Sequence, residues 1–293
     1  MSASLSCSKD ATGGTVLAAQ RHLLPEERLN WNETVNARGW KVPFVGKSPY
    51  QIGKELRPRI DAIIMRGSPV PDEPVVSKAF FAWIPVLERQ WRDIQAEATR
   101  VRTEDIPSLG DISFDHGRIA KDRRWKSFFL KGYGYRMERN CARAPITASL
   151  IEKVPGLVTA TFSVLEAGGH IPRHTGMTKG MLTYHLGLKV PAEREKCRMN
   201  IEGTDQLHIM PWREGDSFVF DDMYNHEVWN ETSEDRYILL IQIKRPCRGL
   251  GNFIQNVFLF AVRYSRFVQD IVRNINDAGH KVSAASTVIQ SEH

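Results

Sequence analysis

Five short segments rich in β-branched and aromatic residues lie between Leu157 and Ile243, and they constrain the fold more than any other feature of the sequence. Gly, Pro, Asn and Asp separate these segments, as turns separate the strands of an antiparallel sheet. The pattern therefore predicts a β-sandwich or a jelly roll. The predicted strands are residues 158–165, 181–190, 197–201, 217–220 and 237–243.

The second of these strands alternates clearly between polar and apolar residues. In the run Leu182-Thr183-Tyr184-His185-Leu186, the polar Thr183 and His185 are two residues apart. Side chains two apart in a strand point to the same face of the sheet, so the polar pair lies on one face and the apolar residues on the other. A face lined with polar groups in this way is typical of a binding cavity.

The composition is that of an ordinary globular protein, with 42% hydrophobic and 25% charged residues in a chain of 293. A formal charge of +6 and a pI near 9.2 favour anionic partners such as acidic substrates, lipid headgroups or nucleic acid. No stretch contains the roughly 20 apolar residues of a membrane-spanning helix, and the N-terminus lacks a signal-peptide core, so we expect a soluble protein. The four cysteines show no C-x-x-C spacing and fit a reducing cytoplasm: Cys7, Cys141, Cys197 and Cys247.

Local residue composition divides the chain into three expected parts. Residues 1–75 mix Pro, Gly and charge with short apolar clusters and are expected to form a loosely ordered arm. Residues 76–246 are expected to form the jelly-roll domain with supporting helices, including an amphipathic helix over 77–101 that packs on a sheet. Residues 247–293 are expected to form a C-terminal amphipathic helix and a tail.

The C-terminal helix has two interpretations. Either its apolar stripe covers the core, or the helix is a basic amphipathic surface through which residues 253–273 contact the inner face of a membrane peripherally. Arginines occupy several of the positions outside the stripe. The predicted stripe contains Ile254, Val257, Phe258, Ala261, Tyr264, Val268, Ile271 and Val272.

Two histidines, His174 and His226, lie at the edges of predicted strands. Imidazole suits Fe(II), and oxygen activation needs open coordination positions, which a site of two histidines and one carboxylate leaves available. In such a site the carboxylate normally lies two residues after the first histidine, but here that position is Gly176. Asp221 and Asp222 precede the second histidine and are expected to fix a histidine tautomer or a turn rather than to bind the metal.

Three further side chains supply what an anionic oxoacid would require. His185 lies on the alternating strand, Arg236 begins another apolar strand, and Ser163 lies on the strand before the first histidine. Arginine can bind a carboxylate bidentately, and a hydroxyl can donate one more hydrogen bond to the same group. The alternative to carboxylate binding is that Arg236 forms a surface ion pair with Glu234 or Asp235. For Ser163, the alternative is an ordinary strand hydroxyl that binds no ligand.

These motifs together resemble the aspartyl/asparaginyl β-hydroxylase family of 2-oxoglutarate dioxygenases. The family pattern is Pro-x-His-x-Gly or Pro-x-His-x-Asp, then a His-Leu-Gly-Leu strand, then Phe-Asp-Asp-x-x-x-His-Glu-x-Trp-Asn. Here residues 172–176, 185–188 and 220–230 match it, and Trp212, Glu214, Gly215 and Arg236 match as well. The resemblance extends over residues 125–246 and implies a double-stranded β-helix core with flanking α-helices.

The resemblance also implies roles for the candidate residues. His174 and His226 would be the iron ligands and form the catalytic centre. Ser163 and Arg236 would bind the far carboxylate of 2-oxoglutarate, and His185 would contact its iron-chelating end. These implied roles agree with the chemistry that the residue types suggest.

Two positions of this family pattern, Gly176 and Thr183, bear on the metal site and the co-substrate site. Gly176 resembles the animal enzymes of the family, in which two histidines bind the iron and a water takes the place of the third ligand. Gly176 therefore does not imply loss of activity. Thr183 stands where the family usually has an arginine that contacts the co-substrate. Thr183 is therefore expected to border the co-substrate site, with Lys179 or Lys189 as candidates to supply the missing charge from a neighbouring position.

A second stretch, residues 124–134, is similar to the bacterial lipid A acyl-chain hydroxylases of the same superfamily. The order of the other parts is similar too: a helix containing Trp91, the segment 141–145, and an Arg245-Pro246 exit that leads to an amphipathic helix. Those lipid enzymes usually carry an N-terminal membrane segment and an aspartate where Gly176 stands. This sequence shows neither feature.

These expectations combine into an Fe(II)-dependent dioxygenase that uses 2-oxoglutarate and O2 to hydroxylate an unactivated C–H bond. The expected substrate is an aspartyl or asparaginyl side chain or a related amino acid or peptide, and the alternative is a lipid acyl chain as in lipid A. A cupin-like metal reaction without 2-oxoglutarate is a rival interpretation, and so is a catalytically silent metal- or ligand-binding relative. No nucleic-acid partner is expected, because the basic cluster at 121–126 comes without a recognised binding motif.

Overall fold

The computed structural model describes residues 8–9, 15–16, 49–101, 106–112, 122–275 and 277. The chain forms two compact units, Met1–Leu56 and Arg57–His293. In the first unit the described residues form an antiparallel pair of strands, β1 (Ser8–Lys9) and β2 (Thr15–Val16), and the start of helix α1 (Pro49–Gly67). All the predicted site residues lie in the second unit.

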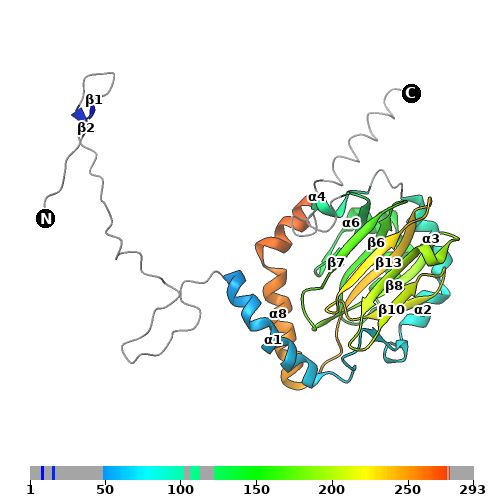
Figure 1. The fold of residues 1–293 in the computed structure, drawn as a ribbon, viewed down its shortest axis with the longest axis horizontal. Coiled ribbons are helices and arrows are strands. Elements are labelled where there is room, and N and C mark those ends of the chain that lie inside the picture. Colours follow the sequence, from blue (N-terminus) through cyan, green and yellow to red (C-terminus); the bar gives the residue numbers. More distant parts are fainter. Residues whose placement is uncertain are drawn as a thin grey trace. The chain divides into compact units, whose positions relative to one another are not determined.

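Two antiparallel sheets form the core of the second unit (Figure 1). The smaller sheet has four strands in the order β10-β9-β12-β7, and the larger has seven in the order β3-β11-β8-β13-β6-β4-β5. The strands of the smaller sheet are β7 (His170–His174), β9 (Cys197–Glu202), β10 (Leu207–Pro211) and β12 (His226–Asn230). Those of the larger sheet are β3 (Val75–Val76), β4 (Trp125–Gly132), β5 (Tyr135–Arg136), β6 (Leu157–Leu165), β8 (Met181–Lys189), β11 (Ser217–Phe220) and β13 (Arg236–Lys244).

From β6 to β13 the chain passes back and forth between the two sheets. Strands β6, β8, β11 and β13 lie in the larger sheet, and β7, β9, β10 and β12 lie in the smaller one. This path winds two facing sheets around a common interior, which is the arrangement of a double-stranded β-helix. The predicted fold class, a jelly roll with flanking helices, is confirmed.

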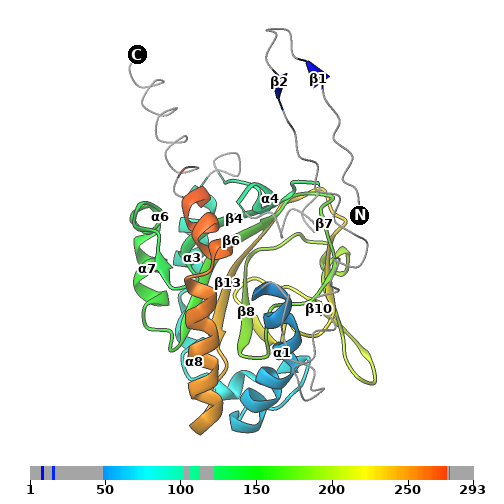
Figure 2. The ribbon, with the colours of Figure 1, turned by 90° about the vertical axis from the view of Figure 1, so that its left-hand side faces the viewer.

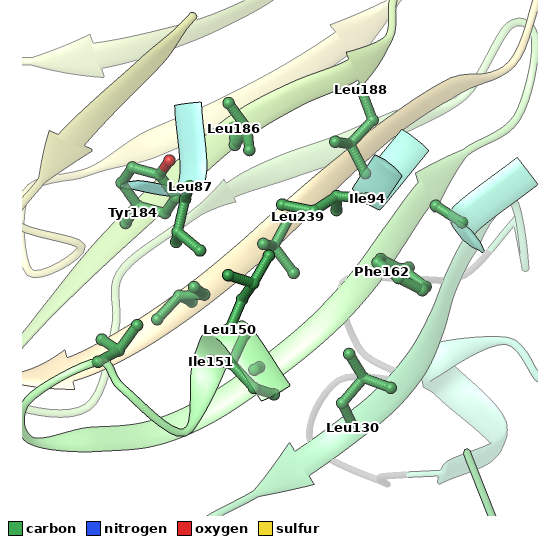
Figure 3. Close-up of a cluster of buried hydrophobic side chains, with 14 of the residues drawn as sticks. Leu87, Ile94, Leu130, Leu150, Ile151, Phe162, Tyr184, Leu186, Leu188 and Leu239 are labelled. Carbon is green, nitrogen blue, oxygen red and sulfur yellow. The ribbon is translucent and has the colours of Figure 1, made fainter. Parts of the chain in front are cut away.

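Helices cover the outer face of the larger sheet. Figure 3 shows the buried side chains there: Tyr184 of β8 and Leu239 of β13 pack with Leu87 and Ile94 from the helices. Because successive residues of a strand point to opposite faces, His185 points the other way, into the space between the sheets. The covering helices are α2 (Ile84–Arg89), α3 (Trp91–Arg100), α6 (Glu138–Arg143) and α7 (Pro145–Ile151).

The prediction of a single helix over 77–101 is wrong, because the segment forms three pieces. A 3₁₀ turn, η3 (Lys78–Phe80), precedes α2 and α3. Proline is tolerated in the first turn of a helix but not in its interior, so Pro85 near the start of α2 prevents a continuous helix. Gln90 interrupts the helix again, with φ −104° and ψ 16°. The packing on the sheet is as predicted, through Ile84, Leu87, Ile94 and Ala98.

Helices α1 and α8 (Gly249–Arg263) approach each other closely through two glycines. A Cβ atom at Gly67 would lie 2.7 Å from the carbonyl oxygen of Arg248, and one at Gly251 would lie 3.0 Å from that of Ile63. A side chain at either position would therefore force the helices apart. Figure 2 shows α8 in orange and α1 in blue in front of the strands.

Both helices also hold the connection between β7 and β8. Asp61 of α1 accepts hydrogen bonds from the Thr178 hydroxyl (2.6 Å) and the Lys179 amide (3.0 Å). Gln255 of α8 donates to the carbonyl oxygen of Gly180 (2.7 Å). The two helices are therefore anchored to the loop that follows His174. The remaining short elements are α4 (Leu109–Ile112) and η5 (Arg194–Lys196), and residues 266–275 are also helical.

Residues 57–75 differ from the expected loosely ordered arm. Ile64 of α1 and Val70 are buried, and β3 begins at Val75 as an edge strand of the larger sheet. The rest of the predicted arm lies outside the described residues, apart from β1, β2 and the start of α1. Among the helices that the structure describes, none combines the length and the apolarity needed to cross a membrane.

A buried ion pair joins the end of β13 to the segment after β11. Arg245 Nη2 lies 2.5 Å from Asp221 Oδ2, and both side chains are fully buried. Arg245→Met leaves the buried Asp221 with Lys179 (3.1 Å) as its remaining ion-pair partner, and it also removes the hydrogen bonds from Arg245 to the carbonyl oxygens of Val70 and Pro71. The substitution should therefore lower the free energy of unfolding by about 3 kcal/mol. Arg123→Met is the matched control, because the Arg123–Asp111 pair is exposed and should contribute less than about 1 kcal/mol. Equal effects in urea unfolding would contradict this assignment.

Candidate active site

The two predicted ligand histidines face each other from neighbouring strands of the smaller sheet. His174 on β7 pairs in register with His226 on β12, and their ring centroids are 4.2 Å apart. The register shifts between this pair and the next, Val228 with Ile171, so β7 carries one extra residue there. Such a bulge re-aims a side chain. As a result both Ile171 and His174 point inward, although strict alternation would separate them.

Hydrogen bonds fix the ring orientation of both histidines. Nδ1 of His174 lies 2.8 Å from the carbonyl oxygen of Pro172, and Nδ1 of His226 lies 2.9 Å from that of Tyr224. A carbonyl oxygen only accepts, so each Nδ1 carries the proton and each Nε2 keeps a free lone pair. Metal-binding histidines are oriented in this way in proteins generally.

Burial keeps these two rings neutral. Desolvation lowers the pKa of His174, and desolvation together with the nearby His174 lowers the pKa of His226 to about 4. Neutral imidazole is the form that binds metals, so the pair is ready to bind at neutral pH. Among the described residues, no group of three or more His, Cys, Asp or Glu side chains is placed to hold a metal ion.

The carboxylate of Asp222 fills the space beside Gly176. A Cβ atom at Gly176 would lie 2.1 Å from Asp222 Oδ1, and the Gly176 amide donates to the Asp222 carbonyl oxygen at 2.6 Å. Thr183 and Gln242 donate to Oδ2, whereas Oδ1 has no hydrogen-bond partner among the described residues. Burial, followed by the charge of Asp221, raises the pKa of Asp222 to about 7.

This close approach predicts that even a methyl group is not tolerated at Gly176. Gly176→Ala should lower the free energy of unfolding by about 2 kcal/mol or more, because the Cβ atom would overlap the Asp222 carboxylate. Asp222→Ala should relieve the overlap, so the two substitutions should be non-additive by about 1 kcal/mol or more. Gly132→Ala is the control, since its Cβ atom would make only ordinary contacts. Additive effects in a double-mutant cycle would show that the overlap is not the cause.

A cluster of buried polar atoms without partners lines the interior next to the histidine pair. Among the described residues, no hydrogen-bond partner is found for either ring nitrogen of His185, for Trp212 Nε1 or for Arg236 Nε. The Arg236 guanidinium lies over the Trp212 ring at 4.4 Å, and Phe220 lies between His185 and His226, with ring centroids 5.0 and 5.4 Å away. Unpaired buried donors are costly, so this cluster fits an anionic ligand.

The alternative of a surface ion pair for Arg236 is wrong. The side chain is only 1% exposed, and burial lowers its pKa to about 10, with Cys197 opposing the shift. Asp235 instead accepts a hydrogen bond from the Ala167 amide at 3.0 Å. Arg236 is therefore a buried cation with no ion pair among the described residues, which suits the carboxylate of a bound oxoacid.

Ser163 is buried, and its hydroxyl is held by a tryptophan for which the sequence predicted no role. Trp125 Nε1 donates to Ser163 Oγ at 3.0 Å, and the Trp125 ring lies 6.3 Å from that of His174. Because Oγ accepts this bond, its own proton is left to donate to another group. The signal in the sequence was only the position of Trp125 within the stretch that resembles the lipid A hydroxylases.

Thr183 faces the interior, but neither lysine replaces the missing arginine. The Thr183 hydroxyl donates to Asp222 at 3.1 Å. Lys179 Nζ is held between Asp72 (2.5 Å) and Asp221 (3.1 Å), and Lys189 Nζ lies over the Tyr237 ring at 5.8 Å. The expectation that one of these lysines supplies the charge is therefore not met.

Comparison with known proteins places the chain in a family. The model for aspartyl/asparaginyl beta-hydroxylase matches residues 88–246, more than half of the 293 residues. An ornithine lipid ester-linked acyl 2-hydroxylase from Rhizobium tropici is 33% identical over 216 residues, which are 73% of this chain and 75% of that protein. The aspartyl/asparaginyl beta-hydroxylase of Homo sapiens is 32% identical over 165 residues, which are 55% of this chain but only 21% of the human protein.

A solved prolyl hydroxylase from Trichoplax adhaerens, in complex with a hypoxia-inducible-factor peptide fragment, aligns with a TM-score of 0.43 and 13% identity, over 72% of this chain and 97% of that one. The match to the family model agrees with the motifs around His174, His185 and His226, which all lie within it. Both the predicted family and the prediction of a hydroxylase are confirmed. The chain belongs to the aspartyl/asparaginyl β-hydroxylase family.

Proposed function

We propose that this protein is an Fe(II)- and 2-oxoglutarate-dependent hydroxylase in which His174 and His226 are the only protein ligands to the iron. Their free Nε2 lone pairs face a common interior, and hydrogen bonds to backbone carbonyls hold both rings. When bound, Fe(II) with 2-oxoglutarate and O2 supplies the oxidising power to hydroxylate an unactivated C–H bond, with succinate and CO2 as the other products.

In this proposal the other side chains bind and orient the co-substrate. Arg236 binds its far carboxylate, supported by the Ser163 hydroxyl, which Trp125 orients. His185 contacts its other end, and Phe220 keeps the space between His185 and His226 apolar. Exclusion of water from this interior strengthens each of these polar interactions.

The proposal rests on one observation: the guanidinium of Arg236 is buried beside the rings of Trp212 and His185, whose nitrogen atoms have no hydrogen-bond partners among the described residues. Arg236 Nε, Trp212 Nε1 and both ring nitrogens of His185 have no partners among the described residues. A fold that buries a cation without a counter-ion is stabilised when an anion binds there. A cupin-like reaction without an oxoacid would leave Arg236 without a function.

For the substrate, we favour the acyl chain of a polar lipid over the aspartyl or asparaginyl side chain that the motifs first suggested. The relative from Rhizobium tropici, named as a lipid acyl hydroxylase, aligns over three quarters of its own length, whereas the human enzyme aligns over about a fifth. The alignment thus extends beyond the residues common to the whole family. A peptide or amino-acid substrate is the second candidate, supported by the Gly176 that the chain shares with the animal enzymes.

Product analysis tests the proposal. The protein would be incubated with Fe(II), 2-oxoglutarate, O2 and either ornithine lipid or an aspartyl peptide, and succinate and the substrate mass would be measured. We expect succinate together with a lipid product heavier by one oxygen atom. A hydroxylated peptide would move the assignment to the second candidate. Product formation without 2-oxoglutarate, or no succinate with any substrate, would contradict the proposed reaction.

A further inference from the structure

Helix α8 presents an apolar stripe to the solvent. Five of its flanking and internal residues are exposed at spacings of three and four, which places them along one side of a helix. Their exposed fractions are Leu250 64%, Phe253 62%, Val257 51%, Phe260 65% and Tyr264 58%. We call these five residues the α8 stripe. Contiguous exposed apolar surface on a helix normally marks an interaction site.

The exposed stripe bears on the two interpretations of the C-terminal helix. Of the apolar residues predicted along it, Val257 and Tyr264 are exposed, as a surface that contacts a membrane requires, whereas Val268 and Ile271 are buried, as a core-covering helix requires. The side of α8 that packs on the protein is held by two small or polar groups, Gly251 and Gln255, which are its buried residues. The large side chains of the α8 stripe are thus left exposed, whereas Ile254 and Phe258 are half-buried.

Charge decides which partner fits. The sequence from Arg245 to Gln269 contains no Asp or Glu, and the exposed Arg248 and Arg266 flank the α8 stripe. Helix α1, which touches α8 at Gly67 and Gly251, adds the exposed Arg66. A second copy packed on this stripe would bring Arg248 and Arg66 toward a surface that is itself rich in arginine, whereas acidic lipid headgroups would complement these charges.

We propose that the α8 stripe docks on the surface of an anionic phospholipid bilayer. Its aromatic and aliphatic side chains would lie at the boundary between headgroups and acyl chains, and the flanking arginines would contact the phosphates. The opposite side of α8 contacts Gly180 through Gln255, in the loop that leads from His174 to β8. Docking would therefore hold this loop, and the histidine pair with it, close to the lipid. Docking would serve the proposed hydroxylation of a lipid, so its biological role rests on the proposed function. Its test does not, because binding to vesicles is measured without turnover.

Sedimentation with vesicles tests docking without turnover. The full-length protein, without iron or 2-oxoglutarate, would be mixed with vesicles of phosphatidylglycerol and phosphatidylcholine, or of phosphatidylcholine alone. We expect binding to the anionic vesicles, and we expect the F253S/F260S variant to bind at least about tenfold more weakly, since each serine removes an aromatic ring from the bilayer. R248Q/R266Q should lose the preference for anionic vesicles, and salt should weaken binding of the wild type.

The control is L207S/I209S, which removes two apolar side chains that are 53% and 58% exposed on β10 instead of α8. This variant should bind vesicles like the wild type. Docking is wrong if the wild type does not sediment with anionic vesicles, if the control loses as much binding as F253S/F260S, or if light scattering shows a dimer that F253S/F260S dissociates. If docking fails while detergent-dispersed lipid is still hydroxylated, only this inference falls, and the proposed function stands.

Discussion

His174→Ala and His226→Ala should each abolish turnover and weaken Fe(II) binding by more than about 100-fold, beyond what the loss of a supporting residue causes. Each substitution removes one of the two imidazole Nε2 lone pairs that face the common interior. A site with three protein ligands could retain some metal after losing one. This site has no third such side chain among the described residues, so a single substitution should suffice. Metal content and succinate formation are the measurements.

His170→Ala is the matched control for these two variants. It changes the same residue type on the same strand, but His170 lies opposite Trp229 and stacks on its ring at 3.5 Å, on the outward side of the bulge. His170→Ala should bind Fe(II) as the wild type does. Full activity in His174→Ala or His226→Ala, or equal loss in His170→Ala, would remove the basis for the two-histidine site.

Arg236→Ala should raise the Kd for 2-oxoglutarate by about 30-fold or more, the effect of removing one partner of a buried charge pair. The guanidinium is 1% exposed and lies over the Trp212 ring, so its removal takes away the buried cation that the co-substrate carboxylate would contact. Arg236→Lys keeps a charge but loses the planar pair of donors, so it should recover only part of the affinity. Fe(II) binding should change little in both variants. The Kd is measured by anaerobic titration of the iron-loaded protein.

Arg198→Ala is the control for loss of an arginine, since Arg198 pairs with Glu231 at 2.6 Å on the outside of the smaller sheet. It should leave the Kd for 2-oxoglutarate unchanged. If Arg236→Ala also keeps its affinity, the unpaired guanidinium has another function, and the carboxylate must be bound elsewhere. Weak iron binding in Arg236→Ala would instead indicate that the substitution disturbs the fold around the histidines.

Five of the strands could be predicted from the sequence because each is apolar and bounded by turn residues, whereas the eight-residue strand β4 was not predicted. Strands β6, β8, β9, β11 and β13 appear within one residue of their predicted bounds. The alternation that placed Thr183 and His185 on the inner face is also correct, because a regular strand keeps its period of two. Strand β7 was not predicted, since Pro172 and the bulge break that period at the very point where His174 turns inward.

The contacts of the site could not be read from the sequence to the same extent. The bond from Trp125 to Ser163 joins β4 to β6, and the overlap between Gly176 and Asp222 joins the segments after β7 and β11. Both depend on which strands become neighbours, which local patterns do not specify. The sequence also left open whether the C-terminal helix covers the core or faces outward, because an apolar helix face has the same period in both cases.

The central claim is that two histidines hold iron next to a 2-oxoglutarate site, and an anaerobic titration tests it most directly. The metal-free protein would be titrated with Fe(II) and then with 2-oxoglutarate while the visible spectrum is recorded. We predict the weak charge-transfer band of a chelated 2-oxoglutarate in the wild type, and its loss in His174→Ala. Binding of iron by the wild type without that band would contradict the claim. It would indicate that the site no longer binds 2-oxoglutarate because Thr183 stands where the family usually has an arginine.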